Sequence, residues 1–98
     1  MFIVKRLPEF DEWLRSLRDD LTQKRLLARL RKAQLGNLGD VKALGENVFE
    51  MREFFGPGWR MYFARKGDVL IIMLGGGEKS SQARDIEVAL DRAKRLVE

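Results

Sequence analysis

The apolar run VLIIML, residues 69–74, constrains the fold more than any other stretch of this chain of 98 residues. Successive side chains of a β-strand point to opposite faces of a sheet, so a strand that is apolar at both parities has to be covered on both faces. Glycine residues, Gly67 and Gly75, bound the run on either side, and the run is shorter than a typical helix. The sequence therefore predicts a central β-strand whose sheet has other elements packed on both sides.

The residues before this run predict two further strands and the turns that join them. We expect strands at about 47–54, 58–65 and 68–74, with a loop at residues 36–40 before the first of them. Glycine and proline favour tight turns, so we place turns at Gly56-Pro57-Gly58 and at Lys66-Gly67-Asp68. This spacing predicts a three-stranded antiparallel meander.

Helical periodicity appears on both sides of the meander. Residues 2–6 predict a short strand at a sheet edge, and Pro8 then suits the first turn of a helix. A second helix, with Thr22 as its N-cap, ends near Gly36, and a last helix has Ser80 or Ser81 as its N-cap. The expected buried stripes of the three helices are Phe10, Trp13, Leu14 and Leu17; Leu26, Leu27, Leu30 and Ala33; and Ile86, Leu90, Ala93 and Val97. The predicted class is α+β: an N-terminal strand, an antiparallel helix pair, the meander and a C-terminal helix, in one domain over residues 1–98.

Composition limits the chemistry that this domain can perform. The chain has no cysteine and no histidine, which excludes disulfides, thiolate metal sites and the commonest general base near neutral pH. We expect no cofactor and no bound metal. The net charge of +4 favours nucleic acid or an acidic protein as partner. No stretch is apolar enough for a membrane span or ordered like a signal peptide, so we expect a cytoplasmic protein without a membrane partner.

Strand parity predicts a polar face on the meander. If the apolar side chains at 49, 51, 61 and 63 face the helix pair, then Glu50, Arg52, Arg60 and Tyr62 emerge together on the opposite face of two adjacent strands. Arg60 then has two readings that the sequence leaves open. It is either an anion-binding group or the structural partner of Glu50 or Glu53 across the strands.

The segment GGGEKSS, residues 75–81, offers a second cluster of polar groups. Flexible glycine backbone, Lys79 and two serines lie where a helix begins, which is typical of a phosphate-binding loop. Glu78 stands where a Walker loop requires glycine, so we exclude that kind of nucleotide site. A plain loop with a helix cap is the alternative. Trp59, beside Gly58 at the turn, is a candidate for a half-exposed stacking ring.

Two longer stretches, FEMREFFGPGWRMYF (residues 49–63) and LGGGEKSSQARDIEVA (residues 74–89), carry a family resemblance. With KRLPEFDEWLRSLRD (residues 5–19), they resemble the addiction-module killer proteins, the HigB-like branch of the RelE/ParE toxin superfamily. The resemblance implies a single toxin domain of that fold and a type II toxin–antitoxin module. It further implies a ribosome-dependent mRNA endoribonuclease, neutralised by a cognate helix-turn-helix antitoxin. A gyrase-poisoning toxin without nuclease chemistry and a degenerate antitoxin-binding co-repressor are the alternatives.

The resemblance also implies a set of site residues. The RNA-binding candidates are Arg52, Arg60, Lys79, Ser80 and Arg84, and the catalytic candidates are Arg60, Arg52, Lys79, Tyr62, Glu50 and Asp85. Fixed positive charges stabilise the dianionic phosphorane that forms when a 2′-hydroxyl attacks its own phosphate. Relatives often place a histidine or tyrosine near the C-terminal end of the site, where this chain has neither. Asp85 and Glu50 are therefore the candidates for the general base.

Overall fold

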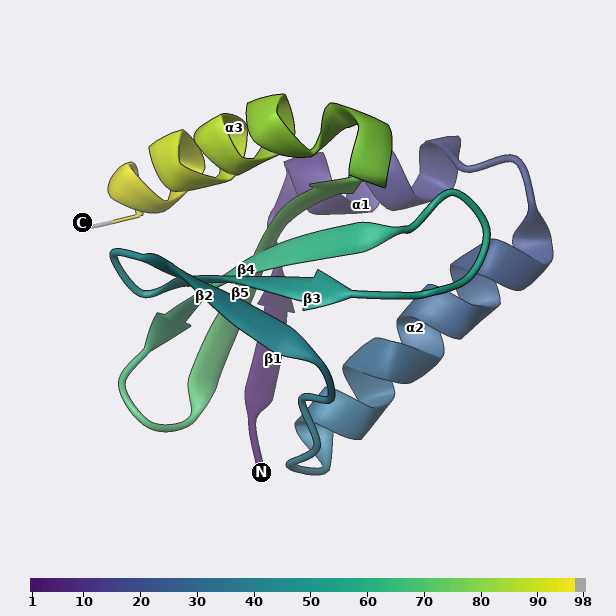
Figure 1. The fold of residues 1–98 in the computed structure, drawn as a ribbon. Coiled ribbons are helices and arrows are strands. Elements are labelled where there is room, and N and C mark those ends of the chain that lie inside the picture. The colour runs from purple at the N-terminus through teal and green to yellow at the C-terminus, as the bar shows by residue number, and fades with distance from the viewer. Residues whose placement is uncertain (97–98) are drawn as a thin grey trace.

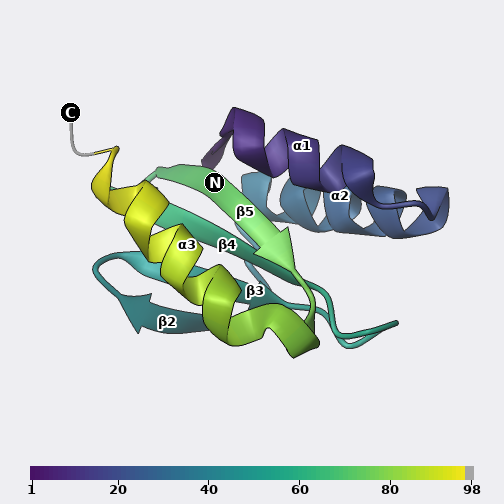
Figure 2. The ribbon, with the colours of Figure 1, turned by 90° about the horizontal axis from the view of Figure 1, so that it is seen from above.

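A five-stranded sheet lies between two helical layers in the computed structural model, which describes residues 1–96 (Figures 1 and 2). The strand order is β1-β5-β4-β3-β2, with β1 parallel to β5 and all other neighbours antiparallel. The strands are β1 (Ile3–Arg6), β2 (Val41–Gly45), β3 (Val48–Arg52), β4 (Arg60–Lys66) and β5 (Leu70–Gly77). The α+β class is confirmed, and β3, β4 and β5 form the predicted antiparallel meander, but the sheet is mixed and has five strands because β1 and β2 extend it.

The two strands outside the predicted meander form the edges of the sheet. The N-terminal strand is an edge strand, as expected, and it pairs in parallel with β5 from Ile3 opposite Leu70. The opposite edge, β2, was missed. Only Val41 and Leu44 of its five residues are half-buried, so its sequence lacks the alternation that marks a strand with one covered face.

Two helices, α1 (Pro8–Ser16) and α2 (Asp20–Gln34), cover one face of the sheet and run in roughly opposite directions (Figure 2). They form one apolar core with β3, β4 and β5, whose buried members are Phe10, Leu14, Leu26, Leu30, Ala33, Met51, Met61, Phe63, Ile71 and Met73. The predicted parity of the meander is therefore confirmed. Leu27, which we expected in the buried stripe, is exposed.

The N-cap of α2 also differs from the prediction. Asp19, rather than Thr22, occupies this position, and its carboxylate accepts hydrogen bonds from the Leu21 backbone N–H at 3.2 Å and the Thr22 hydroxyl at 2.9 Å. A carboxylate there satisfies a free N–H group at the positive end of the helix dipole. Thr22 is thus buried beside the cap instead of forming it.

A third helix, α3 (Gln82–Lys94), covers the opposite face of the sheet (Figure 2). Ser81 is its N-cap residue, as one of our two alternatives had it, and Ser80 lies in the preceding 3₁₀ turn, Lys79–Ser81. Ile86, Leu90 and Ala93 pack against a second core around Tyr62, while Val97 of the predicted stripe lies outside the described residues. No helix within residues 1–96 combines the length and the apolar character needed to cross a membrane.

Candidate functional site

A buried polar cluster lies between the sheet and α3, on the face that strand parity predicted to be polar. Glu50 of β3 and Tyr62 of β4 are directly opposite each other in the antiparallel register, and they are 0% and 1% exposed. The Glu50 carboxylate accepts a hydrogen bond from Gln82 Nε2 of α3 at 2.8 Å and lies 3.7 Å from Arg60 Nε. The predicted neighbours therefore do share one face, but α3 covers the centre of that face.

Several polar atoms in this cluster have no hydrogen-bond partner within residues 1–96. They are Glu50 Oε1, Arg60 Nε, Tyr62 Oη and, at the margin, Arg52 Nε. Burial raises the pKa of Tyr62 well above the ordinary value for tyrosine, and the negative charges of Glu50 and Asp85 raise it further. Tyr62 is therefore a neutral hydroxyl at physiological pH, and it is sealed from solvent.

The glycine triplet is the end of β5 and not a flexible loop. Gly75, Gly76 and Gly77 pair with Tyr62, Met61 and Arg60 of β4. A side chain at any of the three would collide with a neighbour: the Arg92 guanidinium at Gly75, the Trp13 ring at Gly76 and the Asp85 carboxylate at Gly77. These glycines allow close approach of both helical layers to the strand. The predicted phosphate-binding loop is therefore wrong in one respect: the backbone of the glycine triplet belongs to a paired strand and is not a flexible loop.

An open cavity of about 340 Å³ lies beside the turn between β3 and β4. Its lining residues are Glu53, Phe54, Gly56, Pro57, Gly58, Arg60 and Lys79. A Cβ on Gly58 would lie 3.1 Å from Lys79 Cβ and 3.7 Å from Arg60 Nη1, so the two cationic side chains flank this glycine. Arg60 Nη1 also donates to the Gly58 carbonyl at 3.4 Å. The fold therefore brings together two predicted site residues, Arg60 and Lys79, at one accessible cavity.

The other predicted site residues do not line this cavity. Arg52, opposite Arg60 in the register, pairs with Asp40 at 3.2 Å. Asp85 accepts a hydrogen bond from the Ser81 hydroxyl at 2.5 Å and lines a separate cavity of about 370 Å³ between α1 and α3. Ser80 and Arg84 are exposed. Asp85 therefore lies on a different cavity from the two cationic residues, Lys79 and Arg60.

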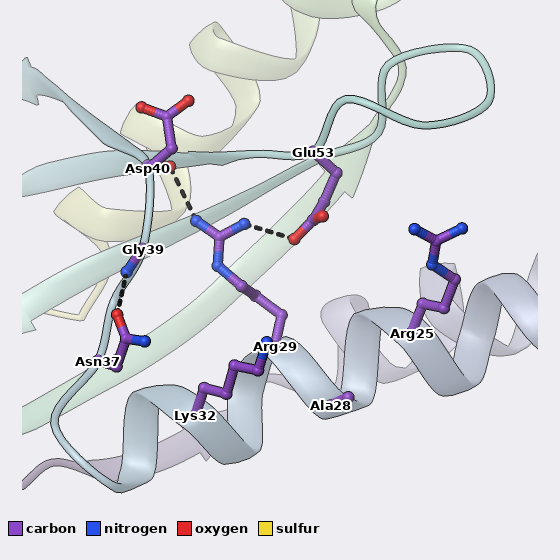
Figure 3. A pocket seen from close by; sticks show the side chains of 8 residues that line it. All are labelled: Arg25, Ala28, Arg29, Lys32, Asn37, Gly39, Asp40 and Glu53. Atoms are coloured by element: carbon purple, nitrogen blue, oxygen red, sulfur yellow. Dashed lines mark hydrogen bonds and ion pairs between the residues drawn. The ribbon is translucent and has the colours of Figure 1, made fainter.

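A further cavity, of about 350 Å³, separates α2 from the loop that leads into β2 (Figure 3). Arg29 spans it, donating to the carbonyls of Leu38, Asp40 and Arg52 and pairing with the Glu53 carboxylate. Figure 3 shows Arg29 between Asp40 and Glu53, with Arg25 and Lys32 on either side of it along α2. Since Arg29 ties the helix to the loop and to the end of β3, its role here is structural.

Sequence reasoning missed two residues of the Arg60 cavity. Glu53 is its carboxylate, which we had considered only as a partner for Arg60 and which instead pairs with Arg29. Phe54 is its aromatic ring, and the signal for it was the pair of adjacent phenylalanines before the Gly-Pro-Gly turn. Trp59, our candidate for a stacking ring, is half-buried and packs edge-on against Trp13 at 6.3 Å between ring centroids. Within residues 1–96, no three acidic side chains gather closely enough to hold a metal ion.

Comparison with known proteins places the chain in a family. The family described as "Phage derived protein Gp49-like (DUF891)", which is associated with the toxins of toxin–antitoxin systems, matches residues 12–97. A Haemophilus influenzae protein that is described as uncharacterized is 38% identical over 93 residues, covering 95% of this chain and 94% of its own length. Since the family match spans most of the chain and the relative aligns along nearly its whole length, the chain belongs to the Gp49-like family of phage-derived proteins.

Proposed function

We propose that this chain is the toxin of a type II toxin–antitoxin module and that it cleaves mRNA on the ribosome, as the HigB-like branch of the RelE/ParE superfamily does. The observation that carries the proposal is the open cavity at which Arg60 and Lys79 flank Gly58, in a chain whose family is associated with such toxins. Two cations on one accessible cavity of a protein with net charge +4 suit a phosphodiester substrate.

Cleavage by the RNA's own 2′-hydroxyl requires a base, a group that stabilises the phosphorane and an acid for the 5′-oxygen. Arg60 and Lys79 supply the stabilisation: the Arg60 guanidinium is held near the Gly58 carbonyl, and the Lys79 side chain is exposed. Glu50 and Tyr62 are too deeply buried to reach a substrate in this conformation. Glu53 is the carboxylate that lines the cavity, and by position it is the candidate for accepting the 2′-hydroxyl proton, for which its ion pair with Arg29 has to open. The leaving 5′-oxygen takes its proton from the Lys79 ammonium or from solvent water at this open cavity, and the ribosome contributes by orienting the mRNA.

The proposed partner is a cognate antitoxin with a helix-turn-helix segment. The cavity's cations are natural contacts for its acidic side chains, which would block the phosphate site and speed association at low salt. The module as a whole acts in the cytoplasm, where translating ribosomes are found.

The second candidate is a toxin that inhibits through binding alone, as gyrase-poisoning members of the ParE branch do. One observation favours it: Tyr62, the chain's single tyrosine, is 1% exposed, and no imidazole exists in the sequence. The Arg60 cavity therefore lacks the side chains that most often move protons in RNA cleavage.

Expression in a bacterial host tests the proposal and separates the two candidates. We expect the parent chain to arrest growth, the adjacent antitoxin gene to restore it, and mapped transcript ends to show cuts within translated messages. Lys79→Ala should lower cleavage at least tenfold, because it removes one of two charges at the phosphorane, with stability unchanged within about 0.5 kcal/mol at this exposed site.

Each result has a distinct reading. Growth at the normal rate with confirmed soluble protein contradicts the toxin assignment. Arrest with intact transcripts and inhibited supercoiling supports the binding toxin instead. Cleavage by Lys79→Ala at the parent's rate would place the reaction away from this cavity.

A further inference from the structure

Two adjacent phenylalanines at the β3–β4 turn have opposite environments. Phe55 packs against the main core, and the Arg25 guanidinium lies 3.7 Å above its ring centroid. Phe54 is 81% exposed, and within residues 1–96 it is the one aromatic side chain among the large hydrophobic residues that are exposed. Phe55 therefore has a structural role that Phe54 lacks.

Phe54 lines the same cavity as Arg60 and Lys79. The cavity's carboxylate, Glu53, is paired with Arg29, so its negative charge is compensated locally. Lys79 is exposed and forms no ion pair within the described part of the chain. The uncompensated charge beside the Phe54 ring is therefore positive.

An exposed aromatic ring beside cations is the arrangement that binds single-stranded nucleic acid, because bases stack on the ring while the cations neutralise phosphates. An anchor site for a protein partner differs, since the centre of such an interface is depleted of charged residues and packed with apolar ones. Around Phe54 the cavity offers Pro57, glycine backbone and three charged side chains. This composition favours RNA over a protein segment.

We infer that Phe54 is a stacking platform for one unpaired base of single-stranded RNA, whose neighbouring phosphate contacts Lys79 and Arg60. The inference rests on the proposed function and adds a base-binding residue to it. The Gly-Pro-Gly turn is compatible with this geometry: Gly56 and Gly58 line the cavity, and their φ values of 58° and 80° favour glycine, which has no side chain to fill it.

The test is direct binding measured by fluorescence anisotropy. The probes are an oligoadenylate of about eight nucleotides, within the site sizes of single-strand binders, and an abasic oligomer of the same length and charge. We expect the parent to bind the oligoadenylate at least about fivefold more tightly than the abasic oligomer. Phe54→Leu should lose this preference, and Phe54→Trp should keep it.

Two further variants serve as controls. Lys79→Ala should weaken both oligomers alike, because it acts on phosphates. Leu35→Ala, at an exposed leucine that lines none of the three cavities described above, should leave both affinities unchanged. Melting temperatures close to the parent's are expected for Phe54→Leu, since this side chain is largely solvated.

Equal affinity of the parent for both oligomers, or no binding of either, overturns the inference, as does an unchanged preference in Phe54→Leu. Loss of antitoxin binding in Phe54→Leu with its RNA preference intact would assign the ring to a protein interface and also overturns it. Failure of the inference alone leaves growth arrest and transcript cleavage by the parent unaffected. Failure of the proposed function removes those two results and can leave the RNA preference in place.

Discussion

The two faces of β3 and β4 are equally inaccessible but differ in chemistry. Towards α1 and α2, Met51 and Met61 are fully buried in an apolar core. Towards α3, Glu50 and Tyr62 are just as deeply buried, yet Glu50 Oε1 and Tyr62 Oη have no hydrogen-bond partner within residues 1–96. A buried polar group without a partner costs free energy, so burying these groups is less favourable than burying the methionines on the opposite face. The two faces therefore differ in polarity: one holds an apolar core, and the other holds a carboxylate and a phenol that α3 covers.

Removing the buried carboxylate should have the largest effect on stability. Glu50→Ala is expected to lower the free energy of unfolding by about 3 kcal/mol, because it leaves the Arg60 guanidinium without its counter-charge and Gln82 without its acceptor. Glu50→Gln keeps an acceptor and the side-chain shape, so it should cost less. Urea denaturation of both variants measures the two losses. A Glu50→Ala urea midpoint equal to the parent's would mean that the Glu50 carboxylate does not stabilise the folded protein.

Arg60 lies at the border between the buried cluster and the open cavity, so it tests whether the two are separate. Its side chain is 10% exposed, faces Glu50 on one side and lines the cavity on the other. Arg60→Lys keeps the charge but loses the planar fork that binds two phosphate oxygens. We expect mRNA cleavage on translating ribosomes to fall at least tenfold, with a melting temperature within a few degrees of the parent's.

Cleavage and melting have to be measured on the same Arg60→Lys preparation. A variant that unfolds, or one that cleaves at the parent's rate, would assign Arg60 to the sheet. Arg60→Ala removes the charge altogether and should lose activity to a similar degree. Equal activity of Arg60→Lys and Arg60→Ala would show that a positive charge at this position is not sufficient.

The features predicted correctly are those that local pattern determines. The both-parity run at residues 69–74 identified a strand that is covered on both faces, although β5 lies next to the edge strand β1 and the centre of the sheet is β4. Alternation along β3 and β4 placed Glu50, Arg60 and Tyr62 on one face. β2 could not be found in this way, because an edge strand with mostly exposed side chains has no apolar period.

The coverage of the polar face was equally out of reach. Parity shows which residues share a face but not which helix packs on it, and α3 closes over Glu50 through contacts between residues far apart in the chain. Gly75–Gly77 suggested a loop because glycine is common in loops. The structure gives a different reason for the three glycines: Trp13, Asp85 and Arg92 occupy the space that side chains at these positions would need. These neighbours lie elsewhere in the sequence, so no local pattern reveals them. Phe54 and Phe55 also cannot be told apart in the sequence, because the core contacts of Phe55 come from residues far away in the chain.

The smallest expected effect concerns the Tyr62 hydroxyl. At neutral pH, Tyr62→Phe removes a buried hydroxyl that has no partner within residues 1–96, so stability should stay equal or rise by up to about 1 kcal/mol. The pKa of Tyr62 is raised by burial, so the folded protein keeps its proton above about pH 10, where an unfolded chain releases it. The unfolded state then binds fewer protons, and the parent loses stability as pH rises through this range.

Tyr62→Phe lacks that loss, since phenylalanine does not ionise. Its stability advantage over the parent should therefore grow by about 1.4 kcal/mol between about pH 9 and about pH 11. Urea denaturation of the two proteins across this range measures the difference, in which the titration of lysines common to both cancels. Parallel curves would mean that Tyr62 ionises as readily in the folded protein as in the unfolded chain. In that event α3 would not seal the polar face, and the hydroxyl would again be a candidate for contact with a substrate in the Arg60 cavity.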